Sequence, residues 1–171
     1  MRDWLAVRAH ATPKATALLA AESTGPPLSY GELHDRVETL AGRLAAAGVC
    51  VDDPIAVCAE TRREFVTVAH AAQRLGAVLV PINARLTERE IEARLDRVDP
   101  EVVICESETE KAVCAAADES PLTLDRPIAD ATALSETDPE PFDLPEWATD
   151  DPLAVLFTSG TTGDPKGVVL T

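Results

Sequence analysis

Short runs of β-branched and other apolar residues alternate along this sequence with longer amphipathic segments, and this alternation restricts the fold more than any other feature. The apolar runs cover residues 55–58, 78–80, 102–105 and 153–157. Each of the first three follows a segment of helical periodicity that ends at a glycine or at an Asp-Pro pair. Such alternation is typical of parallel strands covered on both faces. The sequence therefore predicts an α/β fold with a doubly wound, mostly parallel sheet and flanking helices.

Helix starts are marked by a serine or threonine followed three residues later by glutamate. This spacing lets the two side chains satisfy free N–H groups of a first helical turn. The pairs are Ser29 with Glu32, Thr61 with Glu64, Thr87 with Glu90, and Ser107 with Glu110. We expect a helix to begin at each pair. We also expect a short helix over residues 4–11 and short strands over 17–20 and 28–30.

The chain is strongly acidic, with 30 Asp and Glu against 15 Lys and Arg and a formal net charge of -15. Such a field repels nucleic acids and anionic lipid headgroups, so polyanion-binding proteins are excluded as a class. Lysine occurs only at positions 14, 111 and 166. An acidic, lysine-poor and alanine-rich composition is typical of proteins from salt-loving cells, and an acidic mesophilic protein is the alternative.

The N-terminal residues lack the long apolar stretch of a signal peptide, and no segment has the uncharged length that spans a bilayer. We therefore expect a cytoplasmic protein. The four cysteines form no C-x-x-C pair, and no histidine lies near them at the spacing of zinc ligands. We expect no metal site, and we interpret the cysteines as buried thiols.

Residues 118–151 break the alternation with five prolines among many acidic residues. This composition predicts a long surface connection, with a short strand near residues 122–124. We expect it to be a loop within one domain that covers residues 1–171, because little chain follows it.

A hydroxyl- and glycine-rich segment follows the apolar run at 153–157 directly. It reads Thr158-Ser159-Gly160-Thr161-Thr162-Gly163-Asp164-Pro165-Lys166-Gly167. Glycines let backbone N–H groups approach an anion, hydroxyls add donors, and Lys166 supplies a positive charge. A flexible loop is the simpler interpretation of such composition. The position between two apolar runs and the scarcity of lysine favour a phosphate-binding loop over residues 155–167. Pro165 and Gly167 beside Lys166 distinguish it from a Walker A loop.

At these residues the sequence resembles the AMP-forming, adenylate-forming superfamily of acyl-CoA synthetases, peptide-synthetase adenylation domains and luciferases. Residues 155–166 are similar to its signature loop, 28–33 to its L-[ST]-Y-x-E-L element, and 75–83 to its G-A-x-x-x-P-[IL]-[ND] strand. Residues 83–87 read N-A-R-L-T and resemble the acid–CoA ligases within it. The resemblance is closest in style to 2-succinylbenzoate–CoA ligases of menaquinone synthesis, and fatty acid ligases share the same motifs.

The resemblance implies that a carboxylate reacts with ATP to give an acyl-adenylate and pyrophosphate, after which the acyl group passes to CoA with release of AMP. Mg²⁺ is implied as the ATP complex. The implied nucleotide-binding residues are Thr158, Ser159, Gly160, Thr161, Thr162, Gly163 and Lys166. The family's catalytic lysine belongs to a C-terminal domain that these residues do not include, so no catalytic residue is assigned.

We therefore expect residues 1–171 to form the incomplete N-terminal portion of the large domain of such an enzyme, and to be inactive alone. A separate polypeptide that supplies the remainder is one implied partner. The alternatives are a stand-alone or split nucleotide-binding module without ligase activity, and a structural or regulatory protein.

Overall fold

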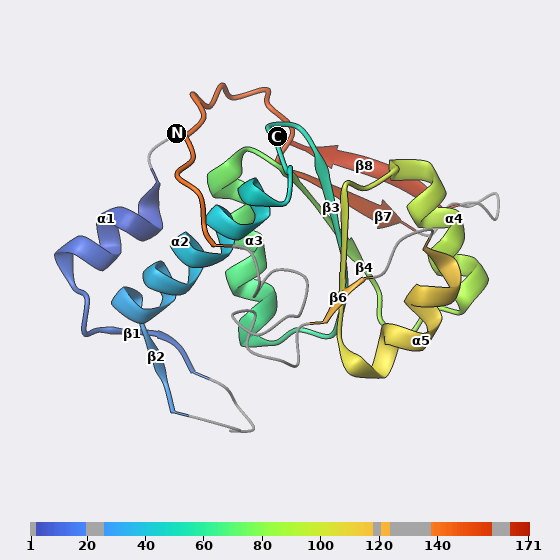
Figure 1. The fold of residues 1–171 in the computed structure, drawn as a ribbon, viewed down its shortest axis with the longest axis horizontal. Helices are drawn as coiled ribbons and strands as arrows, with labels where there is room; N and C mark the ends of the chain where they lie inside the picture. Colours follow the sequence, from blue (N-terminus) through green and yellow to red (C-terminus); the bar gives the residue numbers. More distant parts are fainter. Residues whose placement is uncertain (1–2, 20–25, 118–120, 124–137, 159–164) are drawn as a thin grey trace.

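A sheet of six strands with helices on both faces forms the body of the protein (Figure 1). The structure is a computed structural model that describes residues 3–19, 26–117, 121–123, 138–158 and 165–171. The strands of the sheet are β3 (Pro54–Cys58), β4 (Val78–Ile82), β5 (Val102–Cys105), β6 (Leu122–Thr123), β7 (Ala154–Thr158) and β8 (Lys166–Leu170). The helices are α1 (Trp4–Ala11), α2 (Tyr30–Ala46), α3 (Arg63–Leu75), α4 (Glu88–Val98) and α5 (Ser107–Ala116). A separate antiparallel pair joins β1 (Thr16–Leu18) to β2 (Leu28–Ser29).

The strand order confirms the predicted doubly wound sheet. It runs β6-β5-β3-β4-β7-β8, with parallel pairing from β6 through to β7. The chain moves from β3 to β4 on one side and then returns to place β5 on the other side of β3, so the direction of winding reverses at β3. The last strand, β8, pairs antiparallel with β7 and makes the sheet mixed. It forms one edge of the sheet within the described part of the chain.

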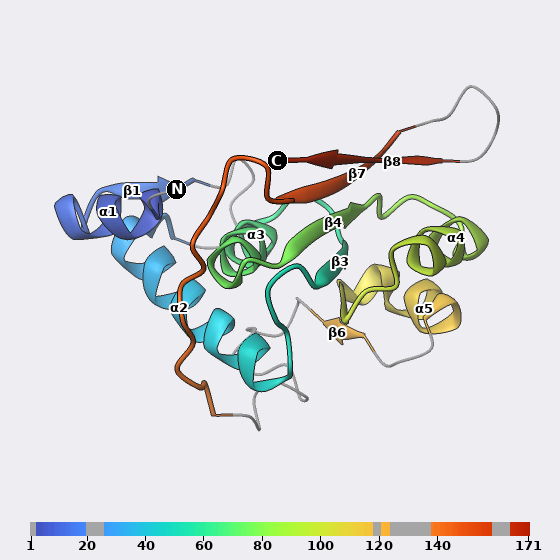
Figure 2. The ribbon, with the colours of Figure 1, turned by 90° about the horizontal axis from the view of Figure 1, so that it is seen from above.

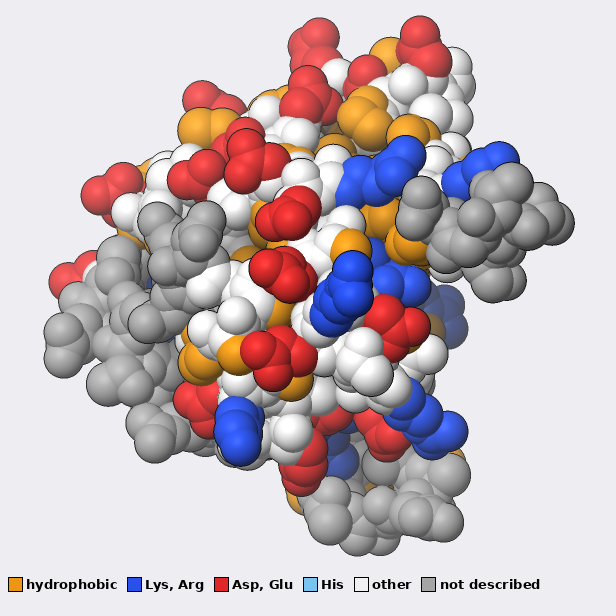
Figure 3. Space-filling view, turned by 90° about the vertical axis from the view of Figure 1, so that its right-hand side faces the viewer, with side chains coloured by type: hydrophobic (Ala, Val, Ile, Leu, Met, Phe, Trp, Pro, Cys, Tyr) orange, Lys and Arg blue, Asp and Glu red, His pale blue; other side chains and the backbone are white. Residues whose placement is uncertain are grey.

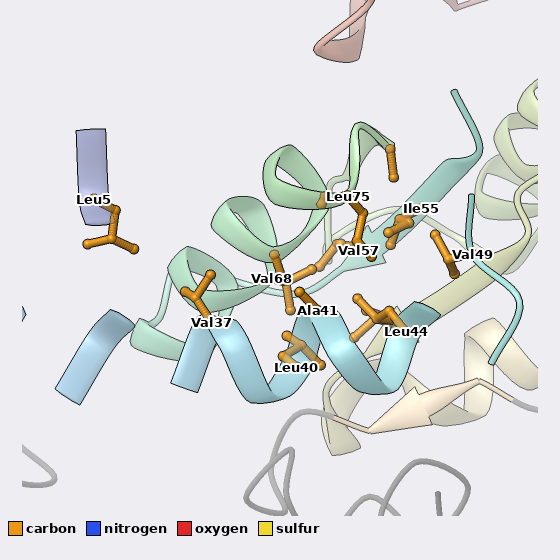
Figure 4. Close-up of a cluster of buried hydrophobic side chains, with 14 of the residues drawn as sticks. Leu5, Val37, Leu40, Ala41, Leu44, Val49, Ile55, Val57, Val68 and Leu75 are labelled. Atoms are coloured by element: carbon orange, nitrogen blue, oxygen red, sulfur yellow. The ribbon is translucent and has the colours of Figure 1, made fainter. Parts of the chain in front are cut away.

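The two faces of the sheet are covered by different helices, as Figure 2 shows from above: α2 and α3 lie on one face, and α4 and α5 on the other. The first face is the larger core. Leu40 and Leu44 of α2 pack there with Val68 of α3 and with Ile55 and Val57 of β3 (Figure 4). The spacing of four residues between Leu40 and Leu44 places both side chains on one stripe of the helix.

All four predicted helices are present, with two of the four predicted caps confirmed and two lying one residue from the observed cap. The Glu32 carboxylate accepts hydrogen bonds from the backbone N–H and the hydroxyl of Ser29, at 2.9 and 2.7 Å. Glu90 does the same for Thr87, at the same two distances.

In the other two helices the observed cap lies one residue away from the predicted cap. The cap of α3 is Arg62, which has no side-chain capping bond, and its guanidinium pairs with Glu64 at 3.2 Å. The cap of α5 is Glu106, whose backbone N–H donates to the Thr109 hydroxyl at 3.2 Å. In α5 the glutamate comes first and the threonine follows three residues later, which reverses the usual order. A pattern that requires a leading serine or threonine does not detect this pair.

Two expectations about burial also need correction. Residues 153–157 are expected to form a buried strand, but in β7 only Ala154 is buried and Leu156 is 39% exposed. Val155 and Phe157 are partly buried against the core formed with α4 and α5, whereas Leu156 points to the other face of the sheet, so only part of this apolar sequence is buried. Cys58 and Cys105 are buried as expected, whereas Cys50 and Cys114 are exposed.

Residues 138–153 cross the outside of α2 and α3 (Figure 2). The Glu140 backbone N–H donates to the Gly42 carbonyl at 3.1 Å. Gly42 permits this approach, because a Cβ there would lie 2.8 Å from the Pro139 side chain. Phe142 packs on the larger core. This part of the proline-rich connection is therefore attached to the helices.

Gly76 ends α3 in a left-handed conformation, with φ of +75°, and a Cβ there would lie 3.1 Å from Pro145. We expect Gly76→Ala to lower the free energy of unfolding by about 1–2 kcal/mol from backbone strain alone, and further from the contact with Pro145. Gly48→Ala is the matched control, because Gly48 has φ of +100° but a Cβ there meets nothing closer than 3.9 Å. Urea unfolding of both variants measures the difference. An equal cost at both positions would contradict the packing contribution.

Candidate functional site

The two ends of the predicted phosphate loop meet across the β7–β8 pair. Thr158, the last residue of β7, is the cross-strand partner of Lys166, the first residue of β8. The Thr158 hydroxyl donates to the Lys166 carbonyl at 3.4 Å. Both residues are exposed, and no ion pair joins Lys166 to another described residue. The only lysine of this region is therefore placed beside a hydroxyl, with its charge free for an anion.

The remaining predicted residues of the loop lie between these two ends. They are Ser159, Gly160, Thr161, Thr162 and Gly163, and all five fall outside the described residues. The structure thus brings Thr158 and Lys166 together and says nothing about the other five.

An open cleft with a volume of about 730 Å³ lies beside Thr158. Its walls come from the segments that follow β3 and β4, from α4, and from the end of β7. The lining residues used below are Glu60, Asn83, Arg85, Arg94, Phe157 and Thr158. The cleft lies at the carboxyl ends of the parallel strands, which is where open α/β sheets bind ligands.

Arg85 brings a positive charge to this cleft from the N-A-R-L-T segment. The Asn83 side chain accepts a hydrogen bond from the Arg85 backbone N–H at 2.9 Å and thereby shapes the turn after β4. The Arg85 guanidinium lies 3.4 Å from the Glu60 carboxylate, but the two side chains are 83% and 63% exposed. An ion pair so exposed contributes at most about 1 kcal/mol. A bound anion can therefore compete with Glu60 for Arg85.

Arg94 brings a second guanidinium. Its Cζ atom lies 5.6 Å from the centre of the Phe157 ring, which is within the range of a cation–π contact. Lys and Arg side chains gather mainly on one half of the face that Figure 3 shows, although the chain has a net charge of -15. Locally concentrated positive charge is what an acidic protein needs in order to hold a polyphosphate.

A second cleft of about 530 Å³ adjoins the first and shares Glu60 with it. It lies between the ends of β3 and β5, where the winding of the sheet reverses. Glu106, which is 6% exposed, accepts hydrogen bonds from the Glu60 backbone N–H at 3.1 Å and from Arg62 at 3.4 Å. Glu106 thereby fixes the segment after β3 that separates the two clefts.

Cys58 ends β3 beside these clefts, but its chemistry does not favour a nucleophile. Burial raises the pKa of the Cys58 thiol, although the neighbouring Thr109 hydroxyl opposes the shift. The thiol is therefore protonated at neutral pH, and the reactive form of cysteine is the thiolate. A structural role is consistent with the Thr109 hydroxyl, which donates to the Cys58 carbonyl at 2.8 Å.

The other cavity of note is a space of about 70 Å³ beside His70 and Arg74, which is room for a few water molecules and not for a nucleotide. In the described ranges no group of three Asp, Glu, His or Cys side chains is arranged to hold a metal ion. Among the helices that the structure describes, none is long and apolar enough to cross a membrane.

The model of the AMP-binding enzyme family matches residues 5–171. The 2-succinylbenzoate–CoA ligase of Listeria monocytogenes is 36% identical over 172 residues, which cover 100% of this chain and 34% of that protein. The ligase of the same name from Bacillus cereus is 33% identical, with coverage of 100% and 33%. The chain thus spans about a third of the length of these curated relatives.

Solved structures agree with the sequence comparison. The o-succinylbenzoate CoA synthetase of Bacillus subtilis, in complex with its acyl-adenylate intermediate, superimposes with a TM-score of 0.82 at 27% identity. The match covers 100% of this chain and 42% of that one. A fatty acyl CoA synthetase of Mycobacterium tuberculosis gives a TM-score of 0.78 at 30% identity and covers 99% and 34%.

Two cleft residues, Arg94 and Phe157, were not predicted as site residues from the sequence. A signal was present for each. Arg94 directly precedes Leu95, a buried residue of the α4 stripe, so its side chain emerges at the border of that stripe. Phe157 lies within the predicted loop of residues 155–167, directly before Thr158, the first of the predicted binding residues. The positions of Arg94 and Phe157 in the sequence do not show that their side chains are in contact.

Proposed function

Since this chain belongs to the family of AMP-binding enzymes, we propose that it forms the N-terminal part of an ATP-dependent, AMP-forming acid–CoA ligase. The observation that carries the proposal is the placement of Thr158 and Lys166. They are the two ends of the hydroxyl- and glycine-rich loop, and Thr158 lines the cleft. This pairing puts Thr158 and Lys166 on neighbouring strands at the end of the sheet where a fold of this kind receives a nucleotide.

The proposed reaction has two steps. A carboxylate attacks the α-phosphorus of ATP, a P–O bond to the pyrophosphate breaks, and an acyl-adenylate forms. The thiol of CoA then attacks the acyl carbon and displaces AMP. Negative charge grows on the pyrophosphate during the first step, so donors that are held near it stabilise the transition state.

The residues of this chain serve the first step. The proposed pyrophosphate-binding residues are Thr158, Ser159, Gly160, Thr161, Thr162, Gly163 and Lys166. Lys166 acts as a cation and not as a nucleophile, because its role is to stabilise charge. Mg²⁺ enters with ATP and is bound to its phosphates. No described group of this chain is assigned as its ligand.

The proposed acid is 2-succinylbenzoate, since proteins named 2-succinylbenzoate–CoA ligase are 31–36% identical to the whole chain. A fatty acid is the second candidate, because a fatty acyl CoA synthetase has a similar structure. We propose a cytoplasmic location, where ATP and CoA are available. Nucleic acids are not proposed as partners, because the net charge is -15.

A separately encoded remainder of the enzyme is the second candidate, and the β8 strand offers it an edge, as it would to further residues of the same chain. All five residues of β8 are exposed, and Val168, Val169 and Leu170 are 44%, 56% and 42% exposed. An uncovered apolar edge strand pairs readily with another strand. In this case the chain is a nucleotide-binding module that becomes active in a complex, and it is inactive alone.

Exchange of labelled pyrophosphate into ATP tests the ligase proposal. The complete enzyme, expressed from the gene with its downstream coding sequence, is expected to exchange pyrophosphate in the presence of 2-succinylbenzoate. A fatty acid of equal concentration serves as the competing substrate. The isolated 171-residue chain is expected to show no exchange. Exchange by the isolated chain would overturn its assignment as an inactive part, and no exchange by the complete enzyme with any acid would overturn the ligase assignment.

A further inference from the structure

Arg94 and Phe157 form a contact between α4 and the end of β7. Both side chains are half-buried, and the Arg94 Cζ atom lies 5.6 Å from the centre of the ring. Phe157 also packs on the second core, which is formed with α4 and α5. The Phe157 ring thus contacts the second core and lies near the Arg94 guanidinium at the wall of the larger cleft.

The position of the Arg94 guanidinium is fixed by its own helix. One of its Nη atoms donates to the Glu90 carbonyl at 2.5 Å. No ion pair joins Arg94 to another described residue; the Glu90 carboxylate, which bonds to Thr87, also interacts electrostatically with the Arg94 charge from one turn away. The other arginines of α4, Arg89 and Arg97, are exposed and do not line the cleft.

Phe157 is placed to act on both ends of the phosphate loop. It directly precedes Thr158, and its cross-strand partner is Gly167, which directly follows Lys166. A Cβ on Gly167 would lie 3.7 Å from the Phe157 ring. The ring therefore lies beside the backbone of β8 at ordinary van der Waals distance, whereas the closest neighbour of such a Cβ would be Val155, at 3.0 Å. A shift of the ring moves the neighbours of Thr158 and Lys166 together.

We propose that Arg94 is a positioning residue that acts through Phe157 to hold Thr158 and Lys166 in place for the phosphates of ATP. The proposal rests on the proposed function, because the ligand of the loop is taken from it. Arg94 restrains the ring from the side of α4, and the ring restrains the paired ends of β7 and β8. Arg94 itself does not contact the nucleotide in this proposal.

Replacement of Arg94 by methionine in the complete ligase tests the contact, because methionine keeps much of the side-chain volume and removes the cation. A cation–π contact of this exposure corresponds to about a 2- to 30-fold change in an equilibrium constant. We expect kcat/KM for MgATP to fall by a factor in this range. We expect the KM values for the acid and for CoA to stay unchanged. Arg97→Met is the matched control on the same helix and is expected to leave all three values unchanged.

A second variant separates positioning from direct contact. Phe157→Leu is expected to lower kcat/KM for MgATP by a similar factor, and the double variant is expected to cost little more than either single variant. Arg94→Lys, which keeps the charge but loses the planar group, is expected to recover part of the loss. Thermal unfolding of each variant identifies any general loss of folding.

Three results would overturn the proposal: equal behaviour of Arg94→Met and Arg97→Met, a loss with Arg94→Met but none with Phe157→Leu, and a double variant whose factors simply multiply. The second result would indicate that Arg94 contacts the ligand directly. The proposed function fails in a different way. If the unmodified enzyme binds ATP but exchanges no pyrophosphate, the ligase assignment is lost and the same variants are compared by their Kd for ATP. Failure to bind ATP would overturn both.

Discussion

If the proposed function holds, replacement of Lys166 by alanine in the complete form of the proposed ligase is expected to slow formation of the acyl-adenylate by about 10²-fold. The ammonium group of Lys166 is the only lysine charge near the loop, and no described carboxylate neutralises it. Charge that develops on the leaving pyrophosphate would lose this partner in the transition state. Pyrophosphate exchange measures the adenylation step without the transfer to CoA.

The control for this variant is Lys111→Ala. Lys111 is exposed on α5 and lines neither of the two clefts. The Lys111→Ala variant removes one positive charge from the same acidic chain, so it measures any effect of net charge alone. We expect it to leave exchange unchanged. If Lys166→Ala exchanged pyrophosphate at the rate of Lys111→Ala, Lys166 would have no part in adenylation.

Replacement of Arg74 by alanine is expected to lower the free energy of unfolding by about 3 kcal/mol. Arg74 lies on α3 with a side chain that is 3% exposed, and it pairs with Asp3 and Glu38. Asp3 also caps α1, since its carboxylate accepts a hydrogen bond from the Ala6 backbone N–H at 3.0 Å. Glu38 belongs to α2. One buried guanidinium thus joins three helices, and its loss removes these pairs and leaves a cavity.

Variants around Arg74 are expected to follow an order that urea unfolding can measure. Arg74→Met lowers the free energy of unfolding less than Arg74→Ala, because methionine fills most of the space of the arginine side chain. The carboxylates of Asp3 and Glu38 are 29% and 50% exposed, so water can solvate them once the guanidinium is removed. The double variant Asp3→Ala with Glu38→Ala costs most, because it leaves a buried guanidinium without its carboxylates. Arg97→Ala, at an exposed position, changes stability by less than about 0.5 kcal/mol. A cost of Arg74→Ala as small as this would contradict the role of the pairs.

The parallel sheet was predictable because its signal is local. The β3 and β5 strands are continuous apolar runs next to marked helix ends, and the structure places them at residues 54–58 and 102–105. The two misplaced helix caps have a local cause as well. At α5 the reciprocal pair is a leading Glu106 with Thr109, and this order has the same chemistry as the reverse but a different sequence pattern.

Features that depend on distant segments were not predictable. The sequence marks Thr158 and Lys166 as ends of a loop, and their direct pairing follows only from the antiparallel return of β8. The exposure of Leu156 depends on which helices reach that end of the sheet. The contact of Arg94 with Phe157 joins residues 94 and 157, and no periodicity links positions so far apart.

The β8 strand follows the predicted phosphate loop and also forms an edge of the sheet in the described part of the chain. Its partner β7 has one registered pair with β4, between Leu79 and Ala154, but five with β8. A strand that adds to the free edge of β8 would restrain the same backbone that carries Lys166. Nucleotide binding and assembly at this edge would then share a coupling free energy, and such coupling is reciprocal: whatever factor assembly adds to the affinity for ATP, ATP adds to the affinity of assembly.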